Sequence, residues 1–70
     1  MKNDQQTPQP LLLTITQAAQ RLGLSRSKLY SLLAQKAGPP VVRFGSSVRI
    51  SVASLETWLR DYEEEQQRER

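Results

Sequence analysis

Cysteine and histidine are both missing from this chain of 70 residues. Their absence excludes disulfides, zinc sites built on thiolate or imidazole, thiol nucleophiles, and the commonest acid–base side chain at neutral pH. The fold must therefore rest on packing alone. Because a chain of this length buries little surface, it supports one small core and leaves little room for a catalytic pocket. We expect a binding protein and not an enzyme, with no cofactor and no small-molecule ligand.

Long apolar runs are also missing, which excludes a membrane-spanning helix. The first six residues, Met1 to Gln6, are polar and lack the apolar stretch of a secretory signal. These absences predict a cytoplasmic protein that does not bind membranes.

Acidic residues are scarce outside the C-terminal end. Five of the seven lie at positions 61 to 69, and before them only Asp4 and Glu56 are acidic. The basic residues ahead of position 61 are Lys2, Arg21, Arg26, Lys28, Lys36, Arg43, Arg49 and Arg60. The net charge of +3 therefore conceals a basic body followed by an acidic end. Such a body indicates a polyanionic partner.

Composition divides the chain into three segments. Residues 1–10 are rich in glutamine and broken by Pro8 and Pro10, which predicts a flexible arm. Residues 11–62 carry the apolar pattern of one domain. Residues 63–70 contain no apolar side chain, so we expect the last helix to fray there into a charged, solvated tail. The alternative for this tail is a segment that docks a protein or repels a second copy.

The domain is expected to begin with an extended segment and a helix. Residues 11–15 are extended, with Leu13 and Ile15 facing the core. Thr16 is a suitable N-cap for a first helix that runs to Leu22.

A second helix is expected after Ser25, which is again a good N-cap. Its Leu29, Leu32 and Leu33 fall on one stripe at helical spacing. The run Gly38-Pro39-Pro40 cannot continue a helix and leads the chain out extended.

The next segment, residues 41–50, alternates in the manner of a strand about Gly45-Ser46-Ser47. It predicts a two-stranded hairpin with Arg43 and Arg49 facing outward. The residues expected to face inward are Val42, Phe44, Val48 and Ile50. Ser51 then caps a third helix, in which one face is formed by Leu55, Trp58, Leu59 and Tyr62.

The first two helices have the spacing of a helix-turn-helix. Ala19 is small where the helices must approach, and Gly23 permits the positive φ of a tight turn. Leu24 is expected to plug the core, with Leu29 and Leu32 anchoring the second helix. An ordinary helical hairpin is the alternative, but it would not require these residues in this register. The predicted fold class is therefore mainly α with a small β-hairpin, a winged helix-turn-helix.

The second helix carries the predicted DNA-reading residues. Arg26, Ser27 and Lys28 lie in its first turn, where a recognition helix usually enters the major groove. The full set predicted on this helix is Ser25, Arg26, Ser27, Lys28, Tyr30 and Ser31. Ser25 would offer its hydroxyl to phosphate, and Tyr30 would bond phosphate or stack on sugar. The alternative is a solvated face with Tyr30 half packed.

The hairpin is the predicted wing. Arg43, Gly45, Ser46, Ser47 and Arg49 would contact a neighbouring backbone or the minor groove, because hydroxyls and guanidinium groups suit phosphate. The alternative is that the two arginines only cover a solvent-facing side of the hairpin. Two like charges there gain nothing from each other, which favours DNA contact.

Several short segments of this domain together form a pattern that is similar to that of a known protein family. They are Leu13-Thr14, Gln17-Ala18-Ala19, Leu22-Gly23-Leu24-Ser25-Arg26-Ser27, Leu29-Tyr30, Pro40-Val41-Val42-Arg43-Phe44-Gly45, Arg49-Ile50 and Leu55-Glu56-Thr57-Trp58-Leu59. In this order they resemble the excisionase-type family, whose fold is related to that of the mercury-resistance (MerR-type) regulators. By position, the resemblance implies DNA contact by Arg26, Ser27, Lys28, Tyr30, Arg43 and Arg49. The wing departs from the family, which often has Arg or Lys after the glycine where this chain has Ser46-Ser47-Val48.

The resemblance implies a recombination directionality factor. Such a protein binds repeated sites near an attachment site, bends the DNA and assists an integrase in excising a mobile element, with cooperative self-association on DNA. One alternative is a small prophage-type transcriptional regulator with the same domain. The other is a protein-interaction module that docks a partner through the acidic tail and the Trp58 face, against which the basic wing and second helix argue.

Overall fold

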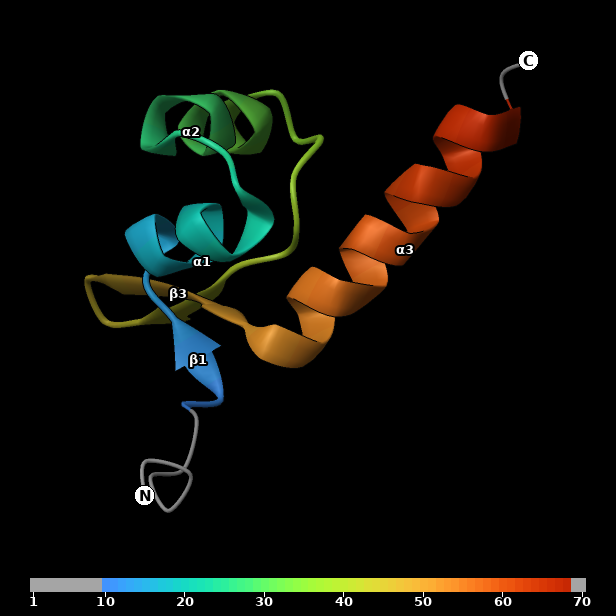
Figure 1. Cartoon of the computed structure of the whole chain (residues 1–70). Coiled ribbons are helices and arrows are strands. Elements are labelled where there is room, and N and C mark those ends of the chain that lie inside the picture. Colours follow the sequence, from blue (N-terminus) through green and yellow to red (C-terminus); the bar gives the residue numbers. More distant parts are fainter. Residues whose placement is uncertain (1–9, 69–70) are drawn as a thin grey trace, which may run out of the picture.

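The computed structural model describes residues 10–68. Apart from Pro10, the predicted arm lies outside the described residues, as does the end of the predicted tail. The elements are β1 (Leu12–Leu13), α1 (Ile15–Leu22), α2 (Arg26–Ala34), β2 (Val42–Phe44), β3 (Ser47–Ser51) and α3 (Val52–Arg68). In Figure 1, α1 lies between α2 and the sheet, and α3 projects from the end of β3 away from the other helices. This mainly helical fold with a small sheet confirms the predicted class.

The sheet has three strands and not the two that were predicted. Its order is β1-β3-β2, and both pairings are antiparallel. The extended segment before α1 is the third strand, because Leu12 pairs with Ser51 and Leu13 with Ile50. The pairing anchors the start of the domain next to the end of the wing, which is defined here as β2, β3 and the turn between them.

Helix α1 begins two residues earlier than predicted. Its N-cap is Thr14 and not Thr16, because Thr14 and Gln17 form a reciprocal capping box. The Thr14 hydroxyl accepts from the Gln17 backbone N–H at 3.1 Å, and the Gln17 side chain accepts from the Thr14 N–H at 3.0 Å. Gly23 ends the helix as predicted, with a φ of +76°.

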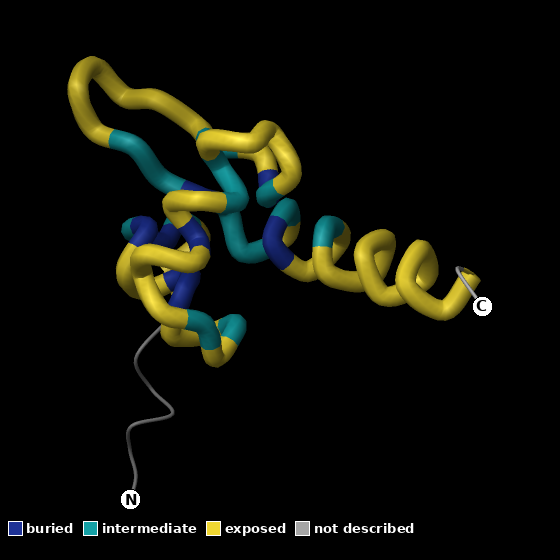
Figure 2. Tube along the Cα trace, turned by 90° about the horizontal axis from the view of Figure 1, so that it is seen from above, coloured by how far each residue is buried: buried dark blue, intermediate teal, exposed yellow. Residues whose placement is uncertain are grey.

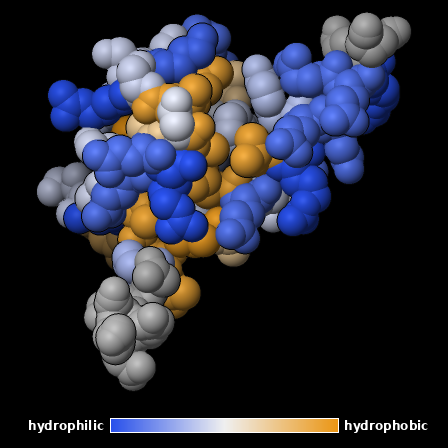
Figure 3. All heavy atoms as spheres, viewed as in Figure 1, coloured by the Kyte–Doolittle hydropathy of each residue, from blue (hydrophilic) through white to orange (hydrophobic). Residues whose placement is uncertain are grey.

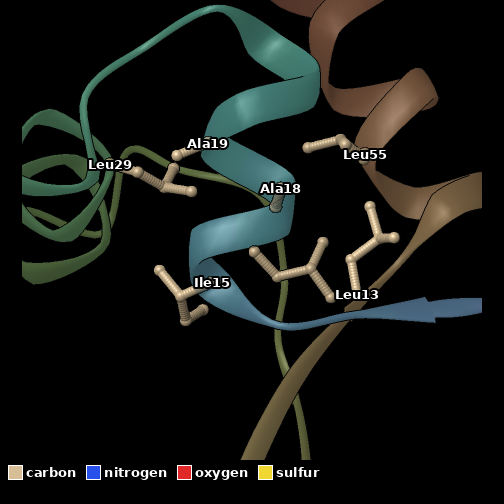
Figure 4. Packing of buried hydrophobic residues seen from close by; sticks show 7 residues of the cluster. Leu13, Ile15, Ala18, Ala19, Leu29 and Leu55 are labelled. Carbon is tan, nitrogen blue, oxygen red and sulfur yellow. The ribbon is translucent and has the colours of Figure 1, made fainter.

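The buried core gathers around α1. It consists of Leu13, Ile15, Ala18, Ala19, Leu29, Ile50 and Leu55. Figure 4 shows most of these side chains pointing toward one another from β1 and the three helices. The predicted inward positions of Leu13 and Ile15 are confirmed. Ala19 is buried where α1 meets α2, and Leu32 and Leu33 pack partly buried against the cluster. Leu24, which was expected to plug the core, is only partly buried.

The wing turn has two residues, Gly45 and Ser46, where the sequence pattern suggested three. Gly45 takes the first turn position with a φ of +61°, which glycine adopts without strain. Phe44 therefore pairs with Ser47 and not with Val48. The cross-strand pairs of the wing are Val42 with Arg49, Arg43 with Val48, and Phe44 with Ser47.

This one-residue change in register reverses the faces of β2, because side chains alternate along a strand. Val48 does face the body and is half-buried, but Val42 and Phe44 are 38% and 54% exposed, so their predicted inward position is wrong. Arg43 shares a face with Val48, and Arg49 shares the opposite face with Val42. The two arginines thus lie on different faces of the wing and not side by side.

Helix α3 begins as predicted and ends later. The Ser51 hydroxyl caps it by accepting from the Ser54 N–H at 3.0 Å, and Leu55 joins the core. The predicted fraying after Tyr62 is wrong, since the helix continues to Arg68. Glutamate, glutamine and arginine are good helix formers, which explains why the last turns stay helical without packing partners. Figure 2 shows its outer turns exposed.

Trp58 fastens α3 to the turn after α2 and does not enter the core. It is half-buried, and its indole Nε1–H donates to the Ala37 carbonyl at 3.1 Å. Its ring stacks on Tyr62 with centroids 5.3 Å apart. The predicted apolar face of α3 therefore buries only its first member, Leu55.

Candidate nucleic-acid interface

The first turn of α2 is presented by its cap and by one buried leucine. The Ser25 hydroxyl accepts from the Lys28 N–H at 3.0 Å, which confirms Ser25 as the N-cap. Leu29 is fully buried and fixes the rotation of the helix about its axis. Arg26, Ser27 and Lys28 are consequently exposed together at the amino end, as the sequence predicted.

The outer face of α2 carries small and mostly polar side chains. Ser27, Ser31 and Ala34 are all exposed on the side opposite Leu29. The Gln35 side-chain amide donates to the Ser31 hydroxyl at 3.2 Å, which orients both groups on this face. Small side chains in the middle of the helix allow its backbone to approach a groove closely.

A groove of about 570 Å³ separates α2 from the wing. Tyr30 and Ala34 line it from α2, while Arg43 and Val48 line it from the wing. Tyr30 is 53% exposed, so its side chain is partly packed against the protein and partly open to solvent. Figure 3 shows apolar side chains gathered over the middle of the molecule and hydrophilic ones over the outer part of α3.

A second, polar cleft of about 420 Å³ joins three elements. Thr14 and Thr16 line it from the start of α1, Tyr30 from α2, and Ser46, Ser47 and Arg49 from the wing. Sequence reasoning missed the two threonines as interface residues. No local signal reveals them, because they reach the wing only through the pairing of β1 with β3.

The predicted site residues fall into two groups around these hollows. Tyr30, Arg43, Ser46, Ser47 and Arg49 border one or both of them, whereas the first turn of α2, Ser31 and Gly45 lie outside both.

Arg49 is the least exposed of the predicted wing residues. It is half-buried, and its Nη1 donates to the Val48 carbonyl at 2.9 Å. The structure thus brings together α2 and the wing tip, but it separates the two wing arginines.

The charge of this surface is of one sign. Residues 10–51 contain no aspartate or glutamate, and their basic residues are Arg21, Arg26, Lys28, Lys36, Arg43 and Arg49. A body with this composition attracts phosphate, and its exposed basic residues on α2 and the wing can meet it. The geometry and the charge both suit a duplex nucleic acid lying across α2 and the wing.

Comparison with known proteins agrees with this geometry. A family described as Helix-turn-helix domain matches residues 12–62, from β1 into α3. A search of curated proteins gives no match to the chain. Within residues 10–68, no helix is both long enough and apolar enough to span a membrane. Because the family match covers most of the sequence, the chain belongs to the helix-turn-helix domain family, and a helix-turn-helix indicates DNA binding.

Proposed function

We propose that this protein binds duplex DNA with α2 in the major groove and the wing on the adjacent backbone or minor groove. One observation carries the proposal. The exposed first turn of α2 and the wing tip belong to a part of the chain, residues 10–51, that has six basic side chains and no acidic one.

In this arrangement the first turn of α2 reads bases. Arg26 and Lys28 are long cations able to reach base edges or phosphates, and Ser27 between them allows close approach. The Ser25 hydroxyl accepts from the Lys28 N–H, so its own hydrogen is left to donate to a phosphate. Ser31 continues the same face one turn later.

The wing positions the protein on the duplex. Arg43 borders the groove beside α2, where a DNA strand passing between α2 and the wing would meet it. Ser46, Ser47 and Arg49 border the polar cleft with Tyr30, and Gly45 keeps the tip narrow. Hydroxyl and guanidinium groups there bind phosphate oxygens and carry little sequence information.

The biological role that we infer is that of a recombination directionality factor. The protein would bind repeated sites near an attachment site, associate there with further copies, bend the DNA and assist an integrase, without catalysing a reaction itself. The supporting observation is the resemblance to excisionase-type proteins from Leu13 to Arg60.

Two steps test this role. Duplexes are first selected by the protein from a random pool, and their bend is measured by energy transfer between dyes at the two ends. The selected sites are then located beside attachment sites or promoters, and excision is assayed with the integrase of the same element. Stimulated excision on bent sites is the expected result. Promoter sites without bending or stimulated excision would instead identify a small transcriptional regulator.

A further inference from the structure

The tip of the wing exposes an aromatic side chain. Phe44 is 54% exposed and Val42, two residues earlier on the same face, is 38% exposed. Neither packs against the core cluster. A single exposed apolar residue is ordinary on a protein surface, but this one stands at the end of a basic hairpin.

The register of the wing keeps Phe44 outside. The face of β2 that turns toward the body is occupied by Arg43, opposite Val48. Because side chains alternate along a strand, Phe44 cannot share that face without a slip that would break every pair of the hairpin. The exposure of Phe44 is therefore a consequence of the fold.

Phe44 is also the largest side chain at the tip. Its pair with Ser47 is the last one before the turn, and the turn itself holds only Gly45 and Ser46. Glycine and serine leave nothing to cover the ring from the turn side. A molecule that docks on the tip would therefore meet the Phe44 ring.

We propose that Phe44 is a wedge that enters the minor groove and inserts between two stacked base pairs. This inference rests on the proposed binding of duplex DNA. Arg43 is next to Phe44 in the strand but on the opposite face, and Arg49 lies on the Phe44 face two positions further from the tip, so each face of the wing carries one cation that would bind phosphates beside the opened step. An apolar ring inserted from this side unstacks one step and bends the duplex toward the major groove, where α2 lies.

Insertion of Phe44 also predicts a preference for certain base-pair steps. Pyrimidine–purine steps such as TA and CA/TG unstack most easily, so insertion costs least there. The wing would then favour sites with such a step beneath Phe44, without any hydrogen bond to a base.

The test uses the full chain and needs no known operator. Closed circular plasmid is relaxed by a topoisomerase in the presence of saturating protein at low salt, and the linking number is measured after the protein is removed. A 30-bp duplex with 2-aminopurine in central TA steps reports unstacking by increased fluorescence. The wild-type protein is expected to change the linking number and to raise this fluorescence.

Substitutions at Phe44 distinguish insertion of the ring between base pairs from contact with the DNA surface alone. Phe44→Ala should lose both signals while binding the plasmid, and Phe44→Leu should retain much of both because leucine is still an apolar wedge. Phe44→Arg should bind at least as tightly as wild type and show neither signal. Leu59→Ala, which removes an exposed apolar side chain from α3, is the matched control and should behave as wild type. Thermal melting of each variant checks that it folds.

The outcomes distinguish this inference from the proposed function. Wild-type signals in Phe44→Ala would overturn the wedge and leave DNA binding intact. Wild-type binding without a change in linking number or fluorescence would also overturn it. Failure of all proteins to bind duplex would overturn the proposed function itself. If Phe44→Ala lowered the sedimenting mass of the free protein instead, the outer face of the wing would be a protein interface and the wedge would be wrong.

Discussion

Residues 10–51 and helix α3 differ in both charge and packing. The first region carries six basic side chains and no acidic one, whereas α3 carries five acidic side chains and two basic ones. The first region holds six of the seven core residues, and α3 contributes only Leu55. Residues 10–51 thus hold most of the core and carry a charge that attracts DNA, whereas α3 is a largely exposed helix whose charge repels it.

This difference orients the protein on a polyanion. Phosphates attract the body and repel the outer turns of α3, so the approach in which α3 points away from the duplex is electrostatically favoured. The helix needs no packing for this effect, because its charges act through solvent over about 8–10 Å at moderate salt.

The largest effect is expected on stability. Leu29→Ala removes a fully buried side chain from the body and should lower the free energy of unfolding by about 2–5 kcal/mol. Leu59→Ala on α3, where the side chain is 39% exposed, should cost about 0.5 kcal/mol or less. Chemical denaturation of both variants measures the difference. Equal losses would show that α3 belongs to the same cooperative core.

The second effect concerns DNA affinity within the basic body. Arg26→Ala and Lys28→Ala should each weaken binding to a selected duplex by about 1–3 kcal/mol, since both lie in the exposed first turn of α2. Arg21→Ala is the matched control, because Arg21 lies near Pro10 and Gln17, outside the hollows beside α2 and the wing. Titration by fluorescence anisotropy measures all three. Unchanged affinity for both α2 variants would contradict the assignment of α2 as the reading helix.

The helices of this fold could be predicted from local signals. Ser25, Gly23 and the leucines of α2 give the helix-turn-helix because capping, positive φ and helical spacing act within a few residues. The start of α1 was missed because Thr14 and Thr16 are both good caps. Only the capping box with Gln17 decides between them.

The sheet depended on choices that local pattern does not make. Gly45-Ser46-Ser47 is compatible with a turn of two or three residues, and that single residue determines whether Phe44 is buried or exposed. The pairing of β1 with β3 joins segments nearly forty residues apart and leaves no periodic signal. The candidate site was therefore predicted on α2 and on the polar residues of the wing, while Thr14, Thr16 and Phe44 emerged only from the three-dimensional arrangement.

The third prediction concerns the division of roles between α2 and the wing. Arg49→Ala should weaken selected and unrelated duplexes by similar factors, and should reduce the dependence of log affinity on log salt by about one unit. Base-reading residues of α2 should instead affect mainly the selected duplex. Titrations of both duplexes at several salt concentrations measure these slopes. A loss of discrimination with an unchanged slope would make Arg49 a base reader.

The smallest effect is expected on α3. Replacing Glu63, Glu64 and Glu65 by glutamine keeps the helix-forming character of these exposed positions and removes three of the charges that repel DNA. Affinity for unrelated duplex should rise a few-fold at low salt. This gain should vanish at high salt, because salt screens the repulsion between the three glutamates and DNA. Thermal melting should not change, because none of the three side chains is buried. Arg68→Gln is the matched control on the same helix and should change affinity slightly in the opposite direction. Weaker DNA binding by the triple variant would mean that these glutamates of α3 favour binding and do not repel DNA. The difference in charge between the two regions would then not explain how the protein approaches its partner.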